Sequence, residues 1–403
     1  MTGHRPFIPL LFAGDINVYS VARAFHEEYG IVSYCYGKYP SGPCMDSKII
    51  HYAAVQRADE AETFLDLVNS FAQNHKDETV LLIGCGDSYV ELASRFKGQF
   101  PENVIAPYID VELMDRIIDK EQFYQLCEEC GVDYPATLVH RQEMGVDVQL
   151  PFAPPYIIKP ANGIEYWKHP FEGQKKVYKA DTYEEFQRVL KDIYIAGYGD
   201  SLIIQEFVPG DDSAMRVLTG YSNEKAEVKM MCLGHVLLEE HTPHGIGNHA
   251  VIITEHEAAL EEKMKGLLAK IGYTGFFNFD IKYDERDGKY KAFEINTRQG
   301  RSNYYVTGAG ANIAKILVED RVHGQEQKFF SVTEEFLWTV VPHSVMKKYI
   351  NPLYQNQIKR LQKEGKEKNP LLYDFDDGTK RRLRVFKSLL GHNLKFKKYL
   401  GSK

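Results

Sequence analysis

Apolar and polar residues alternate along two neighbouring segments, residues 276–283 and 289–296. A period of two is typical of a half-buried strand, so each segment predicts one strand. Between them stands the sequence Asp-Glu-Arg-Asp-Gly, whose residue types favour a turn. We therefore expect a hairpin of two antiparallel strands in this part of the chain.

The predicted hairpin brings acidic side chains together on its polar face. If residues 285–289 form the loop, Asp280 lies directly opposite Glu294, and Asn296 follows two residues later. Like charges on paired strands destabilise a sheet unless something compensates them. Two carboxylates and an amide oxygen are hard ligands that suit Mg²⁺, which usually shares its shell with substrate phosphates. The alternative is a surface hairpin whose charges are simply solvated.

Two units of strand, glycine turn and helix precede the hairpin. Residues 7–12 and 79–83 are apolar strands, and helices follow them at 18–29 and 89–96. Such units favour a parallel sheet, so we expect an α/β (α+β) fold with a parallel α/β domain at the N-terminus. The pattern further predicts helices at 115–130, 182–197, 255–271 and 312–323, two strands joined by a linker within 201–221, and strands at 226–239, 249–253 and 327–342.

Residues suited to nucleotide contact stand between these elements. Lys159 ends an apolar strand beside a glycine-containing loop, where its ammonium group can meet a phosphate. A Pro-Gly break follows residues 206–208, so we expect their backbone groups to be free for an adenine edge. Asp211 and Asp212 come next, within reach of a ribose. Each of these features is also typical of an ordinary strand end or loop.

The net charge of −7 is unevenly divided along the chain. Residues 343–403 carry 16 Lys or Arg against 5 Asp or Glu, so the body is acidic and the tail basic. Four apolar residues line one face of a predicted basic helix there: Leu383, Phe386, Leu389 and Leu390. Two interpretations remain open for residues 380–403. They form either a helix in weak contact with a membrane surface or an anion, or a helix packed on the body with its basic side in solvent.

Length and composition narrow the class of protein. A chain of 403 residues exceeds a single core, so we expect several domains. Six scattered cysteines predict free thiols in a reducing compartment. No segment reaches the ~18 apolar residues of a membrane span, and the apolar run at the start is too short for a signal peptide. We therefore expect a cytoplasmic protein without a nucleic-acid partner.

Taken in order, these residues resemble the ATP-grasp superfamily. The resemblance covers residues 7–320 and implies a nucleotide held between two lobes. It implies domains at 1–115 (N-terminal α/β), 116–220 (small lobe), 221–342 (large lobe with the metal site) and 343–403 (basic tail). It also implies that Lys120 and Lys159 hold the phosphates of ATP. Adenine would then be bound by Glu206, Phe207 and Val208, and the ribose by Asp211 or Asp212. Two Mg²⁺ ions would be held by Asp280, Glu294 and Asn296, and the transferred phosphate by Arg298.

Within the superfamily the chain is most similar to the D-aspartate ligases of Gram-positive bacteria. The stretches PLLFAGDINVYSVARAFHEEYG, PGDDSAMRVL, MMCLGH and YTGFFNFDIKYDERDGKYKAFEINTRQGRS carry this likeness. It implies a ligase that joins the β-carboxylate of D-aspartate to the lysine ε-amine of a UDP-linked muramyl pentapeptide (UDP-MurNAc-pentapeptide), a step of peptidoglycan synthesis. Arg298 would then meet the developing phosphoryl charge, and Arg301 or Arg216 the carboxylate that does not react.

The sequence departs from the superfamily pattern at two places. In many members of the superfamily a glycine-rich loop covers the phosphates, but the corresponding loop here, residues 160–173, has few glycines. Asn278 stands where the D-alanine ligases of the superfamily carry an arginine. This difference weakens an interpretation of the chain as a D-alanyl-D-alanine ligase. Three alternatives stay open: an ATP-grasp ligase for another amino acid or peptide, a non-catalytic nucleotide-binding regulator, and a nucleic-acid or membrane-surface protein that acts through its tail.

Overall fold

The structure is a computed structural model that describes residues 6–161, 163–242 and 245–401. They divide into two compact units. Unit 1 comprises Met1–Met114, Asp211–Asp280 and Ile295–Lys403, and unit 2 comprises Asp115–Gly210 and Ile281–Glu294. The predicted division into four domains stays a prediction.

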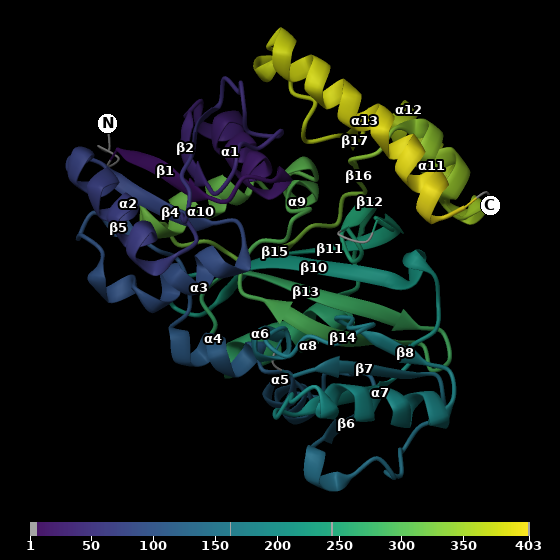
Figure 1. The fold of residues 1–403 in the computed structure, drawn as a ribbon. Coiled ribbons are helices and arrows are strands. Elements are labelled where there is room, and N and C mark those ends of the chain that lie inside the picture. Colours follow the sequence, from purple (N-terminus) through teal and green to yellow (C-terminus); the bar gives the residue numbers. More distant parts are fainter. Residues whose placement is uncertain (1–5, 162, 243–244, 402–403) are drawn as a thin grey trace. The chain divides into compact units, whose positions relative to one another are not determined.

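The N-terminal part of unit 1 is a parallel sheet flanked by helices (Figure 1). The strands run in the order β3-β2-β1-β4-β5, and each neighbouring pair is parallel, as predicted. The elements are β1 (Phe7–Phe12), α1 (Ile16–Tyr29), β2 (Ser33–Gly37), β3 (Ile50–Ala54), α2 (Ala61–Asn74), β4 (Thr79–Gly84), α3 (Asp87–Arg95) and β5 (Val104–Ile105). Phe12 pairs with Gly84, so the turns after β1 and β4 lie at the same edge of the sheet.

The second sheet has the order β14-β13-β10-β11-β12-β16-β17, with β15 beside β11. Its elements, and the helices between them, are β10 (Met215–Ser222), β11 (Val228–Glu239), β12 (His249–Glu255), α8 (Ala258–Lys270), β13 (Gly275–Asp284), β14 (Lys289–Asn296), α9 (Tyr304–Gly308), α10 (Ile313–Arg321), β15 (Phe330–Ser331), β16 (Leu337–Thr339) and β17 (Glu367–Lys368). The predicted hairpin is confirmed as β13 and β14. The single strand predicted at 327–342 is wrong, because β15 pairs with β11 whereas β16 pairs with β12.

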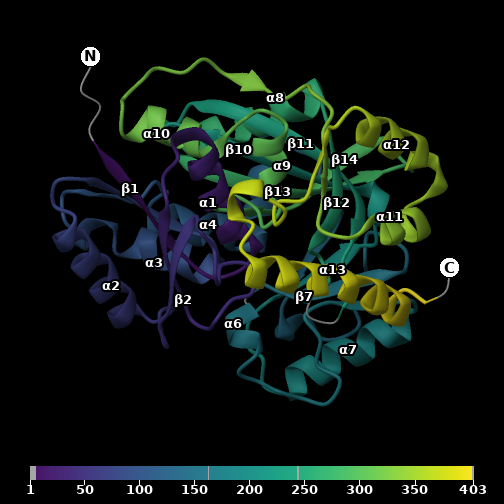
Figure 2. The same ribbon diagram turned by 90° about the horizontal axis from the view of Figure 1, so that it is seen from above.

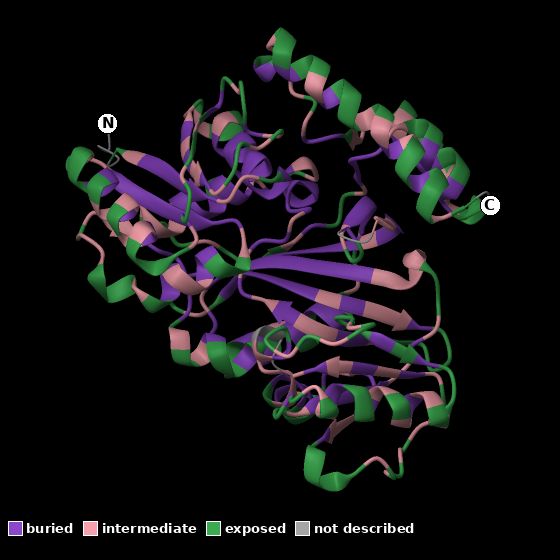
Figure 3. Ribbon diagram, in the orientation of Figure 1, coloured by how far each residue is buried: buried purple, intermediate pink, exposed green. Residues whose placement is uncertain are grey.

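The tail of unit 1 is mostly helical. It contains α11 (His343–Tyr349), α12 (Gln355–Lys363) and α13 (Thr379–Tyr399). Along α13, buried and exposed residues alternate with the helical period (Figure 3). The packed side consists of Arg381, Val385, His392 and Phe396. Three of the four apolar residues expected on one face, Leu383, Phe386 and Leu390, are more than half exposed, so they are not the packed face.

Side-chain contacts hold the start of α13 against α1, and Figure 2 shows the course of the helix. The guanidinium of Arg381 lies 4.2 Å from the ring centroid of Tyr19, and its Nε lies 2.9 Å from Asp376 Oδ2. Tyr19 also donates to Asp376 at 2.8 Å. The interpretation of a helix packed on the body is therefore confirmed for this part of the tail. No helix in the described ranges is long and apolar enough to cross a membrane.

Unit 2 contains an antiparallel sheet in the order β6-β9-β7-β8. Its elements are α5 (Lys120–Glu129), β6 (Thr137–His140), β7 (Tyr156–Pro160), α6 (Gly163–Tyr166), β8 (Tyr178–Ala180), α7 (Tyr183–Ile195) and β9 (Leu202–Glu206), preceded by α4 (Val111–Ile118). The prediction of a single helix at 115–130 is wrong, because α4 and α5 occupy this range. Asp119 adopts an extended conformation and its side chain accepts from the amide of Gln122 at 2.9 Å, so it ends one helix and caps the next.

Candidate active site

The two lysines expected to hold phosphates belong to unit 2. Lys120 is the first residue of α5, and Lys159 lies near the end of β7. Burial and the charge of Lys120 together lower the pKa of Lys159 to about 7, although Glu294 acts in the opposite direction. The electrostatic effect of Lys120 and Glu294 on Lys159 indicates that unit 2 brings these three predicted residues together. A buried ammonium with a second lysine nearby favours an anionic ligand.

Aromatic groups surround Lys159 and were not predicted. Its Nζ donates to the hydroxyl of Tyr124 at 3.3 Å and lies 5.8 Å from the ring centroid of Phe293. Tyr124 in turn donates to the carbonyl of Phe293 at 2.9 Å. These contacts fix the position of the ammonium group, which is the requirement for phosphate binding without reorganisation.

The predicted adenine segment, residues 206–208, is less free than expected. The amide of Glu206 donates to the carbonyl of Ala136 at 2.9 Å, and that of Phe207 to Pro155 at 3.2 Å. The expectation of free backbone groups is therefore wrong for these two amides. Among the hydrogen bonds of the described residues, none uses the amide of Val208, and that leaves this amide available to an adenine edge.

A buried charge network supports the same segment from the β13–β14 hairpin. Lys291 Nζ lies 2.7 Å from both Glu206 Oε1 and Asp284 Oδ2. Arg286 Nη2 bonds Glu206 Oε2 at 2.8 Å and Asp284 Oδ2 at 2.6 Å. Lys282 Nζ donates to the carbonyl of Val208 at 2.9 Å. Because each carboxylate of the network bonds to both cations, the network holds the backbone of the segment in place.

The two candidate ribose ligands lie in unit 1, at the start of a short 3₁₀ helix, Asp212–Ala214. Asp211 Oδ1 accepts from the amide and the hydroxyl of Ser213, at 2.9 and 2.6 Å. Asp212 Oδ2 accepts from the amide of Glu239 at 2.9 Å and from His241 Nε2 at 2.8 Å. Asp211 is the more exposed of the two, and the choice between them stays a prediction.

Two of the three predicted metal ligands lie side by side in unit 1. Asn296 Nδ2 approaches Asp280 Oδ2 at 3.4 Å, and Asn278 Nδ2 approaches Asp280 Oδ1 at the same distance. Asn278 is held in turn by the hydroxyl of Thr219 at 2.7 Å. Glu294 belongs to unit 2, so its predicted pairing with Asp280 stays a prediction.

The donors of this set fit Mg²⁺ in their chemistry. They are carboxylate and amide oxygens, which Mg²⁺ prefers. Within the described ranges, no group of three or more His, Cys, Asp or Glu side chains is placed to hold a metal. Asp280 and Asn296 offer two neighbouring oxygen donors in unit 1, and their role as metal ligands stays a prediction.

The two arginines that follow the hairpin both contact acidic residues at the starts of the helices that follow β1 and β4. Arg298 Nε donates to Asp87 Oδ1 at 2.6 Å. Burial opposes its charge, but Asp87, Asp280 and Asp15 together raise the pKa of Arg298. Arg301 Nε lies 3.9 Å from Asp15 Oδ2. Both arginines thus reach the edge of the sheet where β1 and β4 end.

Arg216, the third predicted arginine, has a different environment. It is buried, forms an ion pair with Glu255, and donates to the carbonyls of Ser213 and Met215 at 2.9 and 3.0 Å. These bonds anchor the start of β10. Its assignment to a substrate carboxylate stays a prediction, and Arg301 is the better placed of the two.

Sequence reasoning missed Asp15 and Asp87, although a signal for them exists. Each follows the carboxyl end of a parallel strand, and ligands of α/β proteins bind at that edge. Asp15 caps α1 by accepting from the amide of Asn17 at 3.0 Å, and its carboxylate lies 3.9 Å from Arg301 Nε.

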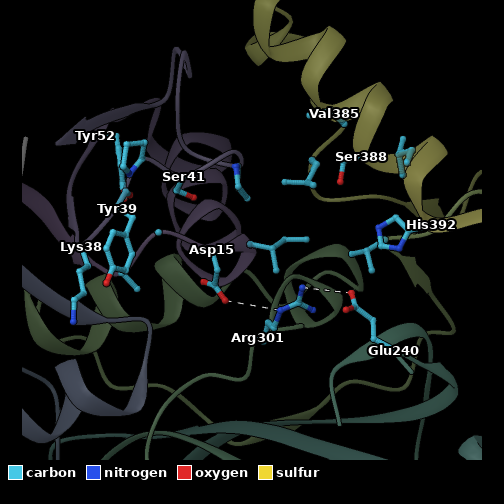
Figure 4. A pocket seen from close by; sticks show the side chains of 18 of the residues that line it. Asp15, Lys38, Tyr39, Ser41, Tyr52, Glu240, Arg301, Val385, Ser388 and His392 are labelled. Carbon is cyan, nitrogen blue, oxygen red and sulfur yellow. Dashed lines mark hydrogen bonds and ion pairs between the residues drawn. The ribbon is translucent and has the colours of Figure 1, made fainter. Parts of the chain in front are cut away.

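Arg301 and Asp15 line a cavity of about 530 Å³ in unit 1. Figure 4 shows Asp15, Arg301 and Glu240 in a row, with His392 of α13 beside them. Arg301 Nη2 lies 3.7 Å from Glu240 Oε1. The volume is in the range of sites for small molecules.

Solved structures with the same fold define the class of protein. One is an N5-carboxyaminoimidazole ribonucleotide synthetase in complex with ADP, with a TM-score of 0.61 and 12% identity, covering 98% of this chain and all of that chain. Another is the biotin carboxylase domain of the 2-oxoglutarate carboxylase of Hydrogenobacter thermophilus, solved with MgADP, ADP and bicarbonate. It has a TM-score of 0.58 and 16% identity, covering 81% of this chain and 72% of that chain. The chain has the ATP-grasp fold, which confirms the predicted fold class.

No family model matches the chain. A D-aspartate ligase of Enterococcus faecium is 41% identical over 414 residues, covering 98% of this chain and 97% of that protein. The chain therefore belongs to the D-aspartate ligase family, and it is an ATP-dependent carbon–nitrogen ligase. This assignment sets aside the alternative of a non-catalytic nucleotide-binding regulator.

Proposed function

We propose that this ligase joins the β-carboxylate of D-aspartate to the lysine ε-amine of a UDP-linked muramyl pentapeptide. The carboxylate attacks the γ-phosphate of ATP and gives an acyl phosphate and ADP. The amine then attacks the acyl carbon, phosphate leaves, and an amide forms. Neither step needs a covalent bond to the enzyme, so catalysis consists of positioning and charge stabilisation. The relation to the Enterococcus protein supports this choice of substrates.

Unit 2 supplies the proposed contacts to the nucleotide. Lys159 and Lys120 hold the phosphates, and the fixed position of Lys159 against Tyr124 favours this role. The Val208 amide meets the adenine edge, and the charge network around Glu206 keeps the segment rigid. A rigid segment reduces the entropy lost when the nucleotide binds.

Asp280, Glu294 and Asn296 are the proposed ligands of two Mg²⁺ ions. When bound, the ions neutralise the charge of the β- and γ-phosphates during transfer. The protein's own contribution lies in the orientation of Asp280, which Asn278 and Asn296 contact from two sides.

Arg298 and Arg301 divide the charges of the substrate between them. Arg298 is largely buried, and Asp280 and Asp15 both act on its pKa, so it is placed to meet the developing phosphoryl charge. Arg301 holds the carboxylate that does not react. The observation that carries the proposal is this pair of guanidinium groups at the edge of the N-terminal sheet, in a chain 41% identical to a D-aspartate ligase.

A screen of ADP release across amino acids, with and without the muramyl pentapeptide, tests the proposal. We expect release with D-aspartate, and a higher rate when the acceptor is present. Release with a different amino acid and none with D-aspartate would point to another ligase of the same fold. Weak contact of residues 380–403 with an anionic surface is a separate proposal, and sedimentation with anionic vesicles tests it.

A further inference from the structure

The cavity beside Arg301 has a wall that the chemistry described so far does not use. Besides the β1–α1 turn and the segment 38–43, it is lined by α13, through residues that include Ser388, His392 and Lys395. In Figure 4 the side chain of His392 lies beside the Asp15, Arg301 and Glu240 row. A helix at the end of the chain thus meets residues from its beginning and middle.

Arg301 is incompletely satisfied in this cavity. Its Nη1 is buried without a hydrogen-bond partner among the described residues. Its other contacts, 3.9 Å to Asp15 and 3.7 Å to Glu240, are too long for hydrogen bonds. A buried guanidinium nitrogen without an acceptor is costly, and a carboxylate is the group whose two oxygens match the guanidinium fork. An anionic ligand would therefore satisfy the guanidinium group of Arg301.

His392 is a second unsatisfied group among the residues that line the cavity. The residue is 8% exposed, and its Nδ1 is buried without a partner among the described residues. Burial and the charges of Lys395 and Arg301 together lower the pKa of His392 to about 4. The imidazole is therefore neutral near pH 7 and has one N–H to donate.

The cavity holds acidic side chains as well as the guanidinium of Arg301. Asp15 and Glu240 lie on two sides of Arg301, so an anion on the guanidinium has carboxylates close by. An α-amino acid carries a carboxylate and an ammonium one carbon apart, and it can satisfy Arg301 and an acid at once. A phosphate or a simple carboxylic acid offers only the anion.

We propose that α13 forms one wall of the amino-acid pocket, that His392 Nδ1 and Arg301 Nη1 bind the α-carboxylate of the substrate, and that Glu240 accepts from its ammonium group. This inference rests on the proposed function, since it takes the substrate to be an amino acid activated at its side-chain carboxylate. It gives the basic tail a role in substrate recognition. The contacts of Arg381 with Tyr19 and Asp376 keep the wall in place.

Two substitutions of His392 separate a hydrogen bond from packing. His392→Phe keeps an aromatic ring but removes the nitrogen, whereas His392→Asn places an amide nitrogen near the position of Nδ1. Leu394→Ala is the matched control, because Leu394 lies on the same helix and is 73% exposed. Initial rates give the KM for D-aspartate, ATP and the acceptor separately, and thermal unfolding gives Tm.

We expect His392→Phe to raise the KM for D-aspartate about tenfold, with the KM for ATP and the Tm unchanged. His392→Asn recovers most of the affinity, and Leu394→Ala equals the wild type. If His392→Phe matches the control, or if it raises only the KM for the acceptor, the inference is wrong while the proposed function stands. If the wild type shows no reaction with D-aspartate, the proposed function fails and this inference fails with it.

Discussion

At the scale of single residues, the account depends on charged groups whose surroundings fix what they can bind. Arg298 is held by Asp87 on one side, and Asp280 and Asp15 act on it from others. Lys159 is buried among aromatic groups with Lys120 nearby. The buried ammonium of Lys159 is costly without a counter-charge, and an anionic ligand relieves that cost, whereas Arg298 already has Asp87 as a partner.

Arg298→Ala tests the role of the first of these groups. Removing it takes away charge stabilisation during phosphoryl transfer, so kcat is expected to fall by about 10²–10³. The Kd for ATP is expected to stay within about threefold of the wild type, because we assign Arg298 to the transition state. Steady-state kinetics and nucleotide titration measure the two effects. Arg188→Ala, at a solvent-exposed arginine of α7, is the control, and near-normal kcat in Arg298→Ala would remove this residue from the mechanism.

Lys159 predicts a pH dependence of nucleotide binding. A lysine with a pKa of about 7 loses its charge as the pH rises through 7, and the phosphates bind the charged form. Above pH 7, ATP binding therefore requires proton uptake, and the KM for ATP is expected to rise by up to about tenfold between pH 7 and 8.5. Lys159→Arg keeps its charge and flattens the profile, whereas Lys191→Arg on α7 leaves it unchanged. A flat wild-type profile contradicts the assignment.

At the scale of elements, the β13–β14 hairpin supports the predicted adenine segment through buried charges. The Lys291 side chain is 8% exposed and contacts both Glu206 and Asp284. Arg286 contacts the same two carboxylates. A buried ion network of this kind contributes position more than net stability, but removing one partner leaves the others uncompensated.

Lys291→Ala is expected to lower the free energy of unfolding of unit 2 by about 2–4 kcal/mol. The reason is that Glu206 and Asp284 lose the ammonium group they share and keep Arg286, with the amide of Ala136 as a further donor to Glu206 at 3.0 Å. Lys289→Ala, at an exposed lysine two residues away whose bond to Asp133 is on the surface, is expected to cost under about 1 kcal/mol. Urea unfolding followed by circular dichroism compares the two. Equal losses in both variants contradict a supporting role for the network.

Elements also show how far the sequence could be interpreted on its own. The alternating hairpin and the strands β1 and β4 of the N-terminal sheet were predicted nearly to the residue, because their patterns are local, whereas β2, β3 and β5 were not predicted. The break at Asp119 was missed, since a capping aspartate inside a helical pattern looks like any other polar residue. The packed side of α13 was missed because the exposed Leu383 and Phe386 are more apolar than the buried Arg381 and His392. The contacts of Arg381 with Tyr19 and Asp376 explain why this side of α13 is the packed one.

At the scale of the whole molecule, the candidate site draws on segments far apart in the chain. Lys120, Lys159 and Arg298 were singled out from their order in the sequence, by its resemblance to a known pattern, and their roles stay predictions. Asp15, Asp87 and His392 were not, because they meet the arginines only through the topology of unit 1. Sequence spacing carries no information about such contacts, so the residues that line the cavity in unit 1 could be found only in the structure.

The metal ligands lend themselves to a test on the complete enzyme. Asp280→Asn and Glu294→Gln each remove one charge, and each is expected to reduce the Mg²⁺-dependent rate by at least about 10³. Glu285→Gln, in the exposed turn of the same hairpin, is the control. Ligation rates across a titration of MgCl₂ measure the effect. Normal turnover in either variant at saturating metal rules out that residue as a ligand.

The mass of the product tests the central claim most directly. The enzyme is incubated with ATP, MgCl₂, the UDP-linked muramyl pentapeptide, and either D- or L-aspartate, and the acceptor is examined by mass spectrometry. We expect D-aspartate to add one aspartyl residue to the acceptor, attached at the lysine side chain, with one ADP released per product. An unchanged acceptor, or equal product from L-aspartate, would contradict the account.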